Sequence, residues 1–201
     1  MVDYKIILAS NSPRRRKLLA GLDIDFEVRV LPDIDESYPA TLPVMETAEY
    51  IAAKKAAVYQ QKMAADELVI TADTVVIVGD EVLGKPADAA EAAQMLRKLS
   101  GRSHQVVTGV CLTTLQQSVQ FSVTTDVTFK QLNNKEIDYY IKKYQPFDKA
   151  GAYGIQEWIG YIGCTGLRGS YYNVMGFPVQ RVYAELQQFF THLHSLPDCR
   201  Q

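Results

Sequence analysis

The stretch LVITADTVVIV at residues 68–78 is almost continuously apolar and rich in β-branched side chains. Such a run is typical of a strand that is buried on both faces at the centre of a sheet. We therefore predict a central strand over residues 67–78, interrupted at its middle by the segment 71–74 (Thr-Ala-Asp-Thr). Gly79-Asp80 predicts a hairpin turn, after which residues 81–83 return as a second strand.

The rest of the chain alternates between predicted strands and predicted helices. We expect further strands over residues 5–9, 26–30, 105–115 and 118–129. We expect helices over 13–20, 44–64, 88–99 (capped by Asp88), 134–143 (capped by Asn134) and from 178 to about 194. Residues 31–43 and the glycine-rich stretch 146–169 are predicted to be irregular. This alternation indicates an α/β fold with a mixed twisted sheet flanked by helices, and we expect one domain over residues 1–201 with two lobes.

The composition is that of an ordinary globular protein, with 47% hydrophobic residues, 22% charged residues and a formal net charge of −2. That balance argues against a protein that coats DNA or RNA, because such proteins are usually basic. The three cysteines, Cys111, Cys164 and Cys199, are widely spaced and predict reduced thiols rather than disulfides or a zinc site. The apolar run 6–9 is too short for a signal peptide and no stretch could span a membrane, so we expect a soluble cytoplasmic protein.

The segment SNSPRR at residues 10–15 lies between a predicted strand and a predicted helix. Ser12 is a good N-cap and Pro13 suits the first helical position, so the free backbone N–H groups of the helix would face this turn. Arg14 and Arg15 add guanidinium forks that match phosphate oxygens. The segment predicts an anion-binding site, although a surface helix cap with solvated arginines would leave the same pattern.

Asp73 is a carboxylate in the middle of an otherwise apolar strand. A buried charge is costly, so it usually has a charged partner or a metal ion. We favour a magnesium ligand or a general base over the alternative, an aspartate at a strand end that is bonded to the backbone. The acidic loop residues Asp33, Asp35 and Glu36 offer further hard oxygen ligands, but on their own they would indicate only a solvated loop.

Residues 79–86, GDEVLGKP, approach the phosphate-binding P-loop pattern without meeting it. Pro86 stands where that loop needs Ser or Thr and lacks the N–H of a phosphate cradle, so Lys85 would contact phosphate in another geometry. The segment KAGAYGIQ at residues 149–156 has small residues that allow a ligand to approach, and Gln156 offers a donor and an acceptor to a base edge. No metal-ligand spacing is formed by the histidines, which are His104, His192 and His194.

Together these segments resemble the Maf family, which is named for septum-formation inhibition. The matches occur in the family's order and cover nearly the whole chain: SNSPRR at 10–15, DE at 35–36, AxxKA at 52–56, ADT at 72–74, GKP at 84–86, SGRSHQVVTGV at 100–110, DKAGAYGIQ at 148–156 and GSYYNVMGFP at 169–178. The resemblance implies a fold related to the inosine-triphosphate pyrophosphatases, elongated and with a cleft between two lobes. It also implies hydrolysis of a nucleoside triphosphate between the α and β phosphates, a divalent cation (Mg²⁺, Mn²⁺ or Co²⁺) and a homodimer. KAGAYGIQ resembles the branch that acts on dTTP and UTP rather than the branch that acts on 7-methyl-GTP.

The resemblance gives the candidate residues their expected roles. Glu36 and Asp73 would hold the metal ion, and Asp73 is also the expected catalytic base. Gln156 would recognise the pyrimidine. The residues expected to bind the triphosphate are Ser10, Ser12, Arg14, Arg15, Lys55 and Lys85. Three residues match family motifs without a role that the sequence assigns, namely Thr108, Lys149 and Asn173.

Three other functions fit part of this pattern. A nucleotide-binding regulator of cell division would bind nucleotides without turnover. A house-cleaning pyrophosphatase would act on modified pyrimidine nucleotides and merely accept dTTP and UTP. A sugar-nucleotide transferase would share the arginine-rich turn and the acidic metal site, but it needs an acceptor site that the sequence does not show. We favour the pyrophosphatase, because the sequence retains each charged group that hydrolysis needs.

Overall fold

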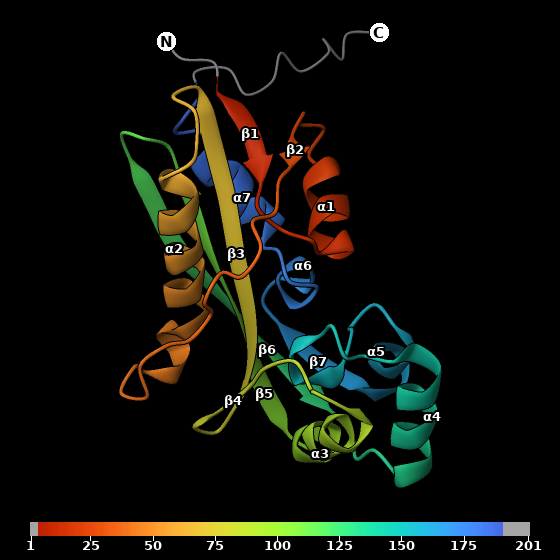
Figure 1. The fold of residues 1–201 in the computed structure, drawn as a ribbon. Coiled ribbons are helices and arrows are strands. Elements are labelled where there is room, and N and C mark those ends of the chain that lie inside the picture. Colours follow the sequence, from red (N-terminus) through yellow and green to blue (C-terminus); the bar gives the residue numbers. More distant parts are fainter. Residues whose placement is uncertain (1–3, 191–201) are drawn as a thin grey trace, which may run out of the picture.

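Within residues 4–190, seven strands form one long twisted sheet (Figure 1). The computed structural model describes residues 4–190. The strand order is β2-β1-β3-β5-β6-β7, and β4 pairs with β3 beside this path. Strand β1 is parallel to β2 and β3, whereas the remaining pairs are antiparallel. The strands are β1 Lys5–Leu8, β2 Glu27–Val28, β3 Glu67–Val78, β4 Glu81–Leu83, β5 Ser103–Thr113, β6 Ser118–Phe129 and β7 Cys164–Arg168.

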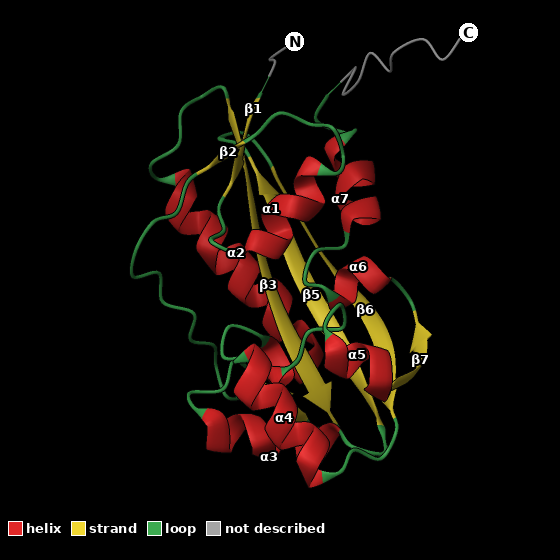
Figure 2. Ribbon diagram, turned by 90° about the vertical axis from the view of Figure 1, so that its right-hand side faces the viewer, coloured by secondary structure: helices red, strands yellow, loops and turns green. Residues whose placement is uncertain are grey.

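Helices flank the sheet on both faces and gather at one end of it (Figures 1 and 2). Helix α2 covers one face, whereas α1 and α7 lie on the other face near β1. Helices α3, α4 and α5 gather at the opposite end of the long strands. The helices are α1 Pro13–Ala20, α2 Thr47–Gln60, α3 Ala89–Leu99, α4 Asn134–Tyr144, α5 Trp158–Gly163, α6 Tyr171–Val174 and α7 Val179–Leu186. No helix within residues 4–190 is both long and apolar enough to cross a membrane.

The long strands β3 and β5 contribute to two large apolar clusters, one toward each end. Residues 68, 70 and 72 of β3 pack with α1 and α7 in one cluster. Val76, further along the same strand, packs with α3 and α4 in the other. Thr74 therefore lies on β3 between the two clusters, whereas Asp73 points to the opposite face of the sheet, toward Lys55 on α2.

Strand β3 is continuous, so the predicted interruption at residues 71–74 is wrong. The main chain keeps its register with β5 through this segment, with Asp73 opposite Gly109. Polar side chains do not break a strand whose backbone bonds are intact, since the ladder uses only N–H and C=O groups. The hydroxyl of Thr71 donates a hydrogen bond of 2.8 Å to the carbonyl of Ala52 on α2, so this polar side chain ties the strand to the helix.

Helix α2 approaches the sheet closely at Gly109. A Cβ atom at this position would lie 2.3 Å from the carbonyl carbon of Ala48 and 2.3 Å from the nitrogen of Glu49. Both atoms belong to the helix backbone, so no side-chain rotation could relieve the contact. The glycine therefore sets how near α2 lies to the strands. It thereby also sets how far the side chains of α2 lie from Asp73.

Several element boundaries differ from those predicted. The α4 cap is Asn133 rather than Asn134, because Asn133 and Glu136 exchange side chain-to-backbone bonds in a capping box. The stretch 146–169, predicted to be irregular, contains α5, β7 and a 3-10 turn over Ala150–Ala152. These short elements follow from tertiary packing, since β7 pairs with β6 and Ile159 is fully buried.

Three other predicted elements are too long. The strand predicted over 26–30 is only Glu27–Val28, and the helix predicted over 44–64 ends at Gln60. The last helix ends at Leu186, and the part predicted for residues 191–194 lies outside the described residues. The ends of helices and strands depend on local competition between turns and helical hydrogen bonds. Hydrophobic periodicity alone does not locate these ends.

We predict that Gly109→Ala lowers the free energy of unfolding by about 2–3 kcal/mol, because the added methyl group forces α2 away from β5. Urea titration followed by circular dichroism measures the change. Gly84→Ala is the matched control, since a Cβ atom there meets nothing within 4 Å, and it should stay within about 0.5 kcal/mol of the wild type. Equal stability of the two variants would contradict the close approach.

Candidate active site

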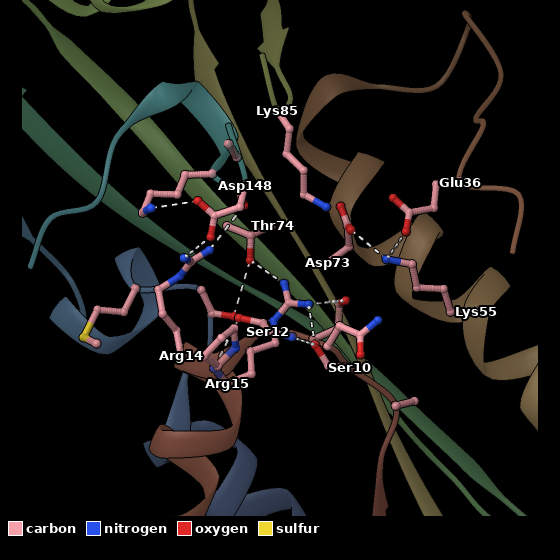
Figure 3. A pocket seen from close by; sticks show the side chains of 18 of the residues that line it. Ser10, Ser12, Arg14, Arg15, Glu36, Lys55, Asp73, Thr74, Lys85 and Asp148 are labelled. Carbon is pink, nitrogen blue, oxygen red and sulfur yellow. Dashed lines mark hydrogen bonds and ion pairs between the residues drawn. The ribbon is translucent and has the colours of Figure 1, made fainter. Parts of the chain in front are cut away.

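One cavity of about 530 Å³ opens between the end of β1, the middle of β3, the loop before α2, and the segment after α4 (Figure 3). It brings together residues that are far apart in the sequence. All nine residues predicted for the site line it: Ser10, Ser12, Arg14, Arg15, Glu36, Lys55, Asp73, Lys85 and Gln156. Their convergence is an observation, whereas their individual roles remain predictions.

Lys55 joins the two carboxylates of the cavity. Its Nζ lies 2.9 Å from Asp73 Oδ1 and 2.9 Å from Glu36 Oε1. The Lys55 and Asp73 side chains are only 12% and 15% exposed, so the ammonium group compensates a charge that water reaches poorly. Burial acts to raise the pKa of Glu36, but the hydrogen bond and charge of Lys55, with the charges of Lys85 and Arg15, lower it below its usual value. Glu36 is therefore ionised at neutral pH.

The acidic loop divides its carboxylates between the cavity and the surface. Asp35 turns outward, where its Oδ2 lies 2.6 Å from Lys54 Nζ and its two oxygens accept bonds from the backbone N–H and hydroxyl of Ser37. Glu36, the next residue, turns inward to Lys55. Of the acidic residues considered as metal ligands in this loop, only Glu36 shares a partner with Asp73, while Asp33 lines the cavity without doing so.

Helix α1 begins at the cavity. Ser12 is its N-cap, with its hydroxyl accepting a bond of 3.4 Å from the backbone N–H of Arg15, and Pro13 occupies the first turn. The backbone N–H of Ser12 donates to Ser10 Oγ at 3.2 Å, which holds the turn between β1 and α1. The positive end of the helix therefore faces the cavity, and its predicted role in anion binding stays a prediction.

Arg15 spans the cavity wall rather than extending freely into it. Its Nε donates to the carbonyl of Gly176 at 2.9 Å, one terminal nitrogen donates to the carbonyl of Ala72 at 2.9 Å, and the other donates to Thr74 Oγ1 at 3.0 Å. Burial lowers the pKa of Arg15, and the charge of Asp73 partly opposes this effect. The Arg15 side chain thus connects α1 to β3 and to Gly176, and it still adds a positive charge to the cavity wall.

Arg14 belongs to a series of ion pairs that the sequence did not predict. Its terminal nitrogen lies 2.7 Å from Asp148 Oδ2, and Lys149 Nζ lies 2.7 Å from Asp148 Oδ1 and 3.1 Å from Glu157 Oε1. Burial acts to raise the pKa of Asp148, but Lys149 and Arg14 lower it overall. Asp148 lies inside the quoted DKAGAYGIQ segment, so that motif was the available signal; its partner Arg14 is 134 residues away.

Thr108 and Asn173, which the sequence left without a role, support the cavity from behind. Thr108 Oγ1 lies 3.0 Å from Thr74 Oγ1 and donates to the carbonyl of Asn173 at 3.3 Å. The amide nitrogen of Asn173 donates to the carbonyl of Val106 and to Thr125 Oγ1, both at 3.0 Å. Neither residue lines the cavity itself, in contrast to Lys149.

Gln156 presents an unused acceptor. Its Oε1 atom is buried and has no hydrogen-bond partner among residues 4–190. Such a group normally has a partner, and a donor from a ligand in the cavity would supply one. The same cavity also has apolar lining residues, namely Val76, Val106, Tyr153, Val174 and Met175. This combination suits a planar base with an N–H at its edge.

His104 is a core residue. Its Nε2 lies 2.7 Å from the hydroxyl of Tyr153, and its ring contacts Phe129 edge to face. Burial lowers the pKa of His104 to about 4, so the ring is neutral at physiological pH. The other two histidines, at positions 192 and 194, lie outside the described residues.

The carboxylate pair fits a divalent cation that is bound together with substrate. Among residues 4–190, no three Asp, Glu, His or Cys side chains gather into a metal site of their own. Mg²⁺ is commonly held by one or two carboxylates, waters and substrate phosphates rather than by a full protein cage. Glu36 and Asp73 already converge on one cation, Lys55 Nζ, and therefore have the donor chemistry that such an ion requires.

We predict that Arg15→Lys lowers the free energy of unfolding by about 2–4 kcal/mol, because one ammonium group cannot reach the three acceptors that the guanidinium holds. Urea titration measures the loss. Arg16→Lys on the exposed side of α1 is the control and should change stability by less than about 0.5 kcal/mol. If Arg15→Lys were as stable as the control, the wall-spanning role would be wrong.

The fold resembles two solved structures of low sequence identity. The Ham1 protein of Staphylococcus aureus matches with a TM-score of 0.55 at 17% identity, covering 92% of this chain and all of that chain. A HAM1 protein from Coxiella burnetii matches with a TM-score of 0.50, also at 17% identity, covering 92% of this chain and 99% of that chain. These likenesses confirm the predicted fold class, a mixed sheet flanked by helices as in the Ham1 proteins.

Sequence relatives are much closer. A protein of Parabacteroides distasonis is 61% identical over 92% of this chain and 96% of its own length, and one of Phocaeicola vulgatus is 60% identical with the same coverage. A protein of Porphyromonas gingivalis is 56% identical over 92% of this chain and 94% of its own length. All three are named dTTP/UTP pyrophosphatase. A family model described as Maf-like protein matches residues 5–189, and the chain belongs to this family.

Proposed function

We propose that the chain is a nucleoside triphosphate pyrophosphatase that hydrolyses dTTP and UTP to the nucleoside monophosphate and pyrophosphate. The observation that carries the proposal is a single cavity with charged groups suited to phosphate and, in Gln156 Oε1, an unpaired acceptor suited to a base. The relatives with 56–61% identity, named for this activity, support the same conclusion.

The triphosphate would bind at the start of α1 and between the lysines. Hydrolysis of phosphate anhydrides depends mainly on positioning and on stabilisation of negative charge. Arg14, Lys55 and Lys85 supply cations, and Lys85 extends into the same space as the carboxylate pair (Figure 3). Ser10 and Ser12 supply hydroxyl groups beside the helix N-terminus, whose N–H groups favour phosphate oxygens.

Asp73 is our candidate for the base. It would take a proton from a water molecule whose oxygen attacks the α-phosphorus, while the bond from the α-phosphorus to the bridging oxygen breaks and pyrophosphate leaves. Its place on a central strand fixes its position, and its partner Lys55 keeps it oriented. Glu36 and Asp73 would hold a divalent cation, Mg²⁺, Mn²⁺ or Co²⁺, which when bound supplies positive charge to the phosphate oxygens.

Gln156 would give the preference for pyrimidines with a uracil-type edge. Uracil and thymine both present O2, N3–H and O4 along that edge, so the amide could accept from N3–H through Oε1 and donate to a carbonyl through Nε2. The thymine methyl group lies away from this edge, on C5, and the apolar lining of the cavity suits it. The same Gln156 side chain would therefore accept both dTTP and UTP.

The remaining expectations concern location and assembly. We place the activity in the cytoplasm, as expected from the sequence. Of the three cysteines, the one at position 199 lies outside the described residues. The homodimer implied by the resemblance stays a prediction.

The direct test is pyrophosphate release by the purified protein from a panel of nucleoside triphosphates, with Mg²⁺, with Mn²⁺ and with a chelator. We expect release from dTTP and UTP well above release from ATP and GTP, and no release with the chelator, because the carboxylate pair would have no cation to hold. Turnover of purine nucleotides instead would contradict the assignment of Gln156. Binding without turnover of any nucleotide would favour a regulatory protein.

We predict that Asp73→Asn lowers kcat by about 10³-fold, because the amide cannot accept the proton of the attacking water. Nucleotide affinity, measured by calorimetry in the presence of chelator, should change little, since Arg14 and Lys85 are untouched. Asp80→Asn, at the exposed hairpin that ends β3, is the matched control. Near-normal turnover by Asp73→Asn would overturn the base assignment.

A further inference from the structure

A buried tyrosine holds the turn that carries Gln156. Tyr140 on α4 is fully buried, and its hydroxyl does not line the cavity. The hydroxyl accepts a hydrogen bond of 3.0 Å from the backbone N–H of Gly154 and donates a short hydrogen bond to Glu157 Oε2. One hydroxyl group therefore fixes both ends of the four-residue turn 154–157, and Gln156 lies between these two attachment points.

Glu157 is the second member of this support. Its other carboxylate oxygen, Oε1, lies 3.1 Å from Nζ of Lys149, a residue that does line the cavity. Burial and the neighbouring Glu157 raise the pKa of Tyr140 above its usual value, so the hydroxyl stays protonated and remains a donor. The carboxylate thus connects the buried hydroxyl to the cavity wall through a charged partner.

The turn is too tight for its side chains to move freely. The backbone N–H of Glu157 donates to the carbonyl of Gly154 at 3.0 Å, which closes the turn. A Cβ atom at Gly154 would lie 2.9 Å from Glu157 Cδ and 3.0 Å from Gln156 Nε2. Both side chains therefore fold back over the glycine, and the amide nitrogen of Gln156 is the end that lies on the side of the Glu157 carboxylate. A negative charge there favours the N–H end of the amide over its oxygen, because only the N–H end is a donor.

The orientation of that amide decides which base it can read. A uracil edge offers an N3–H donor between carbonyl acceptors, whereas a cytosine edge offers an N3 acceptor beside an amino donor. A glutamine that rotates its amide by half a turn exchanges Oε1 for Nε2 and serves the cytosine edge equally well. Discrimination between the two bases therefore requires an amide held in one orientation, with Oε1 toward the base.

We propose that Tyr140, acting through Glu157 and Gly154, holds the Gln156 amide in one orientation and thereby sets the preference for uracil and thymine over cytosine. The inference rests on the proposed function, since it assigns Gln156 to the base. Tyr140 is a positioning residue in this scheme, because it touches neither the substrate nor the reacting atoms.

The test is Tyr140→Phe, which keeps the buried ring and removes only the hydroxyl. Initial rates give kcat and KM for UTP and CTP. We expect the ratio of kcat/KM for UTP to that for CTP to fall about tenfold, through KM for UTP, with kcat changing less than about threefold. Gln156→Ala should lose the same preference, because it removes the reader itself. Tyr144→Phe, on the same helix and stacked on the Tyr140 ring, should keep the wild-type ratio.

Two substitutions of Glu157 test the proposal independently, in case Tyr140→Phe fails to fold. Glu157→Ala removes the carboxylate that accepts the hydrogen bond of Tyr140 and should lose the same preference. Glu157→Gln still accepts that hydrogen bond and should restore most of it. A folded Tyr140→Phe or Glu157→Ala protein with an unchanged ratio would overturn the proposal.

Binding measurements separate this inference from the proposed function. Dissociation constants of UTP and CTP, measured by calorimetry with chelator, need no turnover. A wild type that releases no pyrophosphate would contradict the proposed function, yet a binding preference for UTP that Tyr140→Phe loses would still support the positioning role. Equal affinity of the wild type for both nucleotides would overturn it.

Discussion

The ion pair between Lys55 and Asp73 is the interaction on which the rest of the site depends. Asp73 places a carboxylate on the central strand with only 15% of its side chain exposed, where an uncompensated charge would be strongly unfavourable. Lys55 comes from α2, so the helix must lie close enough to the sheet for its ammonium group to reach Asp73 at 2.9 Å. Gly109, opposite Asp73 on β5, makes that close approach possible.

The same ammonium group also orders the loop before α2. Glu36 turns inward because Lys55 is already there as its partner, while the neighbouring Lys54 holds Asp35 outward at 2.6 Å. Two adjacent lysines on one helix thus sort two adjacent acids of one loop into an inner and an outer carboxylate. A helix presents neighbouring residues about 100° apart, which is the separation this sorting needs.

The sequence predicted those parts of the molecule whose signals are local. Helix α1 begins and ends where Ser12, Pro13 and Gly21 predict, and the paired strands β5 and β6 occupy nearly the predicted ranges. The predicted site residues that follow β1 and those on β3 line one cavity, because the end of β1 and the middle of β3 are neighbours in the sheet. The motif of each segment was therefore enough to predict these cavity residues without knowledge of the fold.

Features that rest on distant partners were missed or misplaced. An interruption of β3 was predicted at residues 71–74, because composition does not show that β5 completes the ladder there. Strand β7 forms by pairing with β6, and helix α5 buries its own Ile159 in the core, so the glycine-rich stretch gave no periodic signal. Asp148 owes its place to Arg14, 134 residues earlier, and such a pair cannot be read from spacing.

The charge balance of the cavity supports the proposal that a divalent cation takes part. Of the described residues, five cationic side chains line it (Arg14, Arg15, Lys55, Lys85 and Lys149) against four acidic ones (Asp33, Glu36, Asp73 and Asp148). The lining therefore carries a net charge of only one positive unit, and most of the cations already neutralise a neighbouring acid. A triphosphate brings several negative charges, so the side chains alone leave it under-compensated. A divalent cation held by Glu36 and Asp73 would supply the missing charge at the point where the protein concentrates its carboxylates, and this is the physical reason for expecting metal dependence.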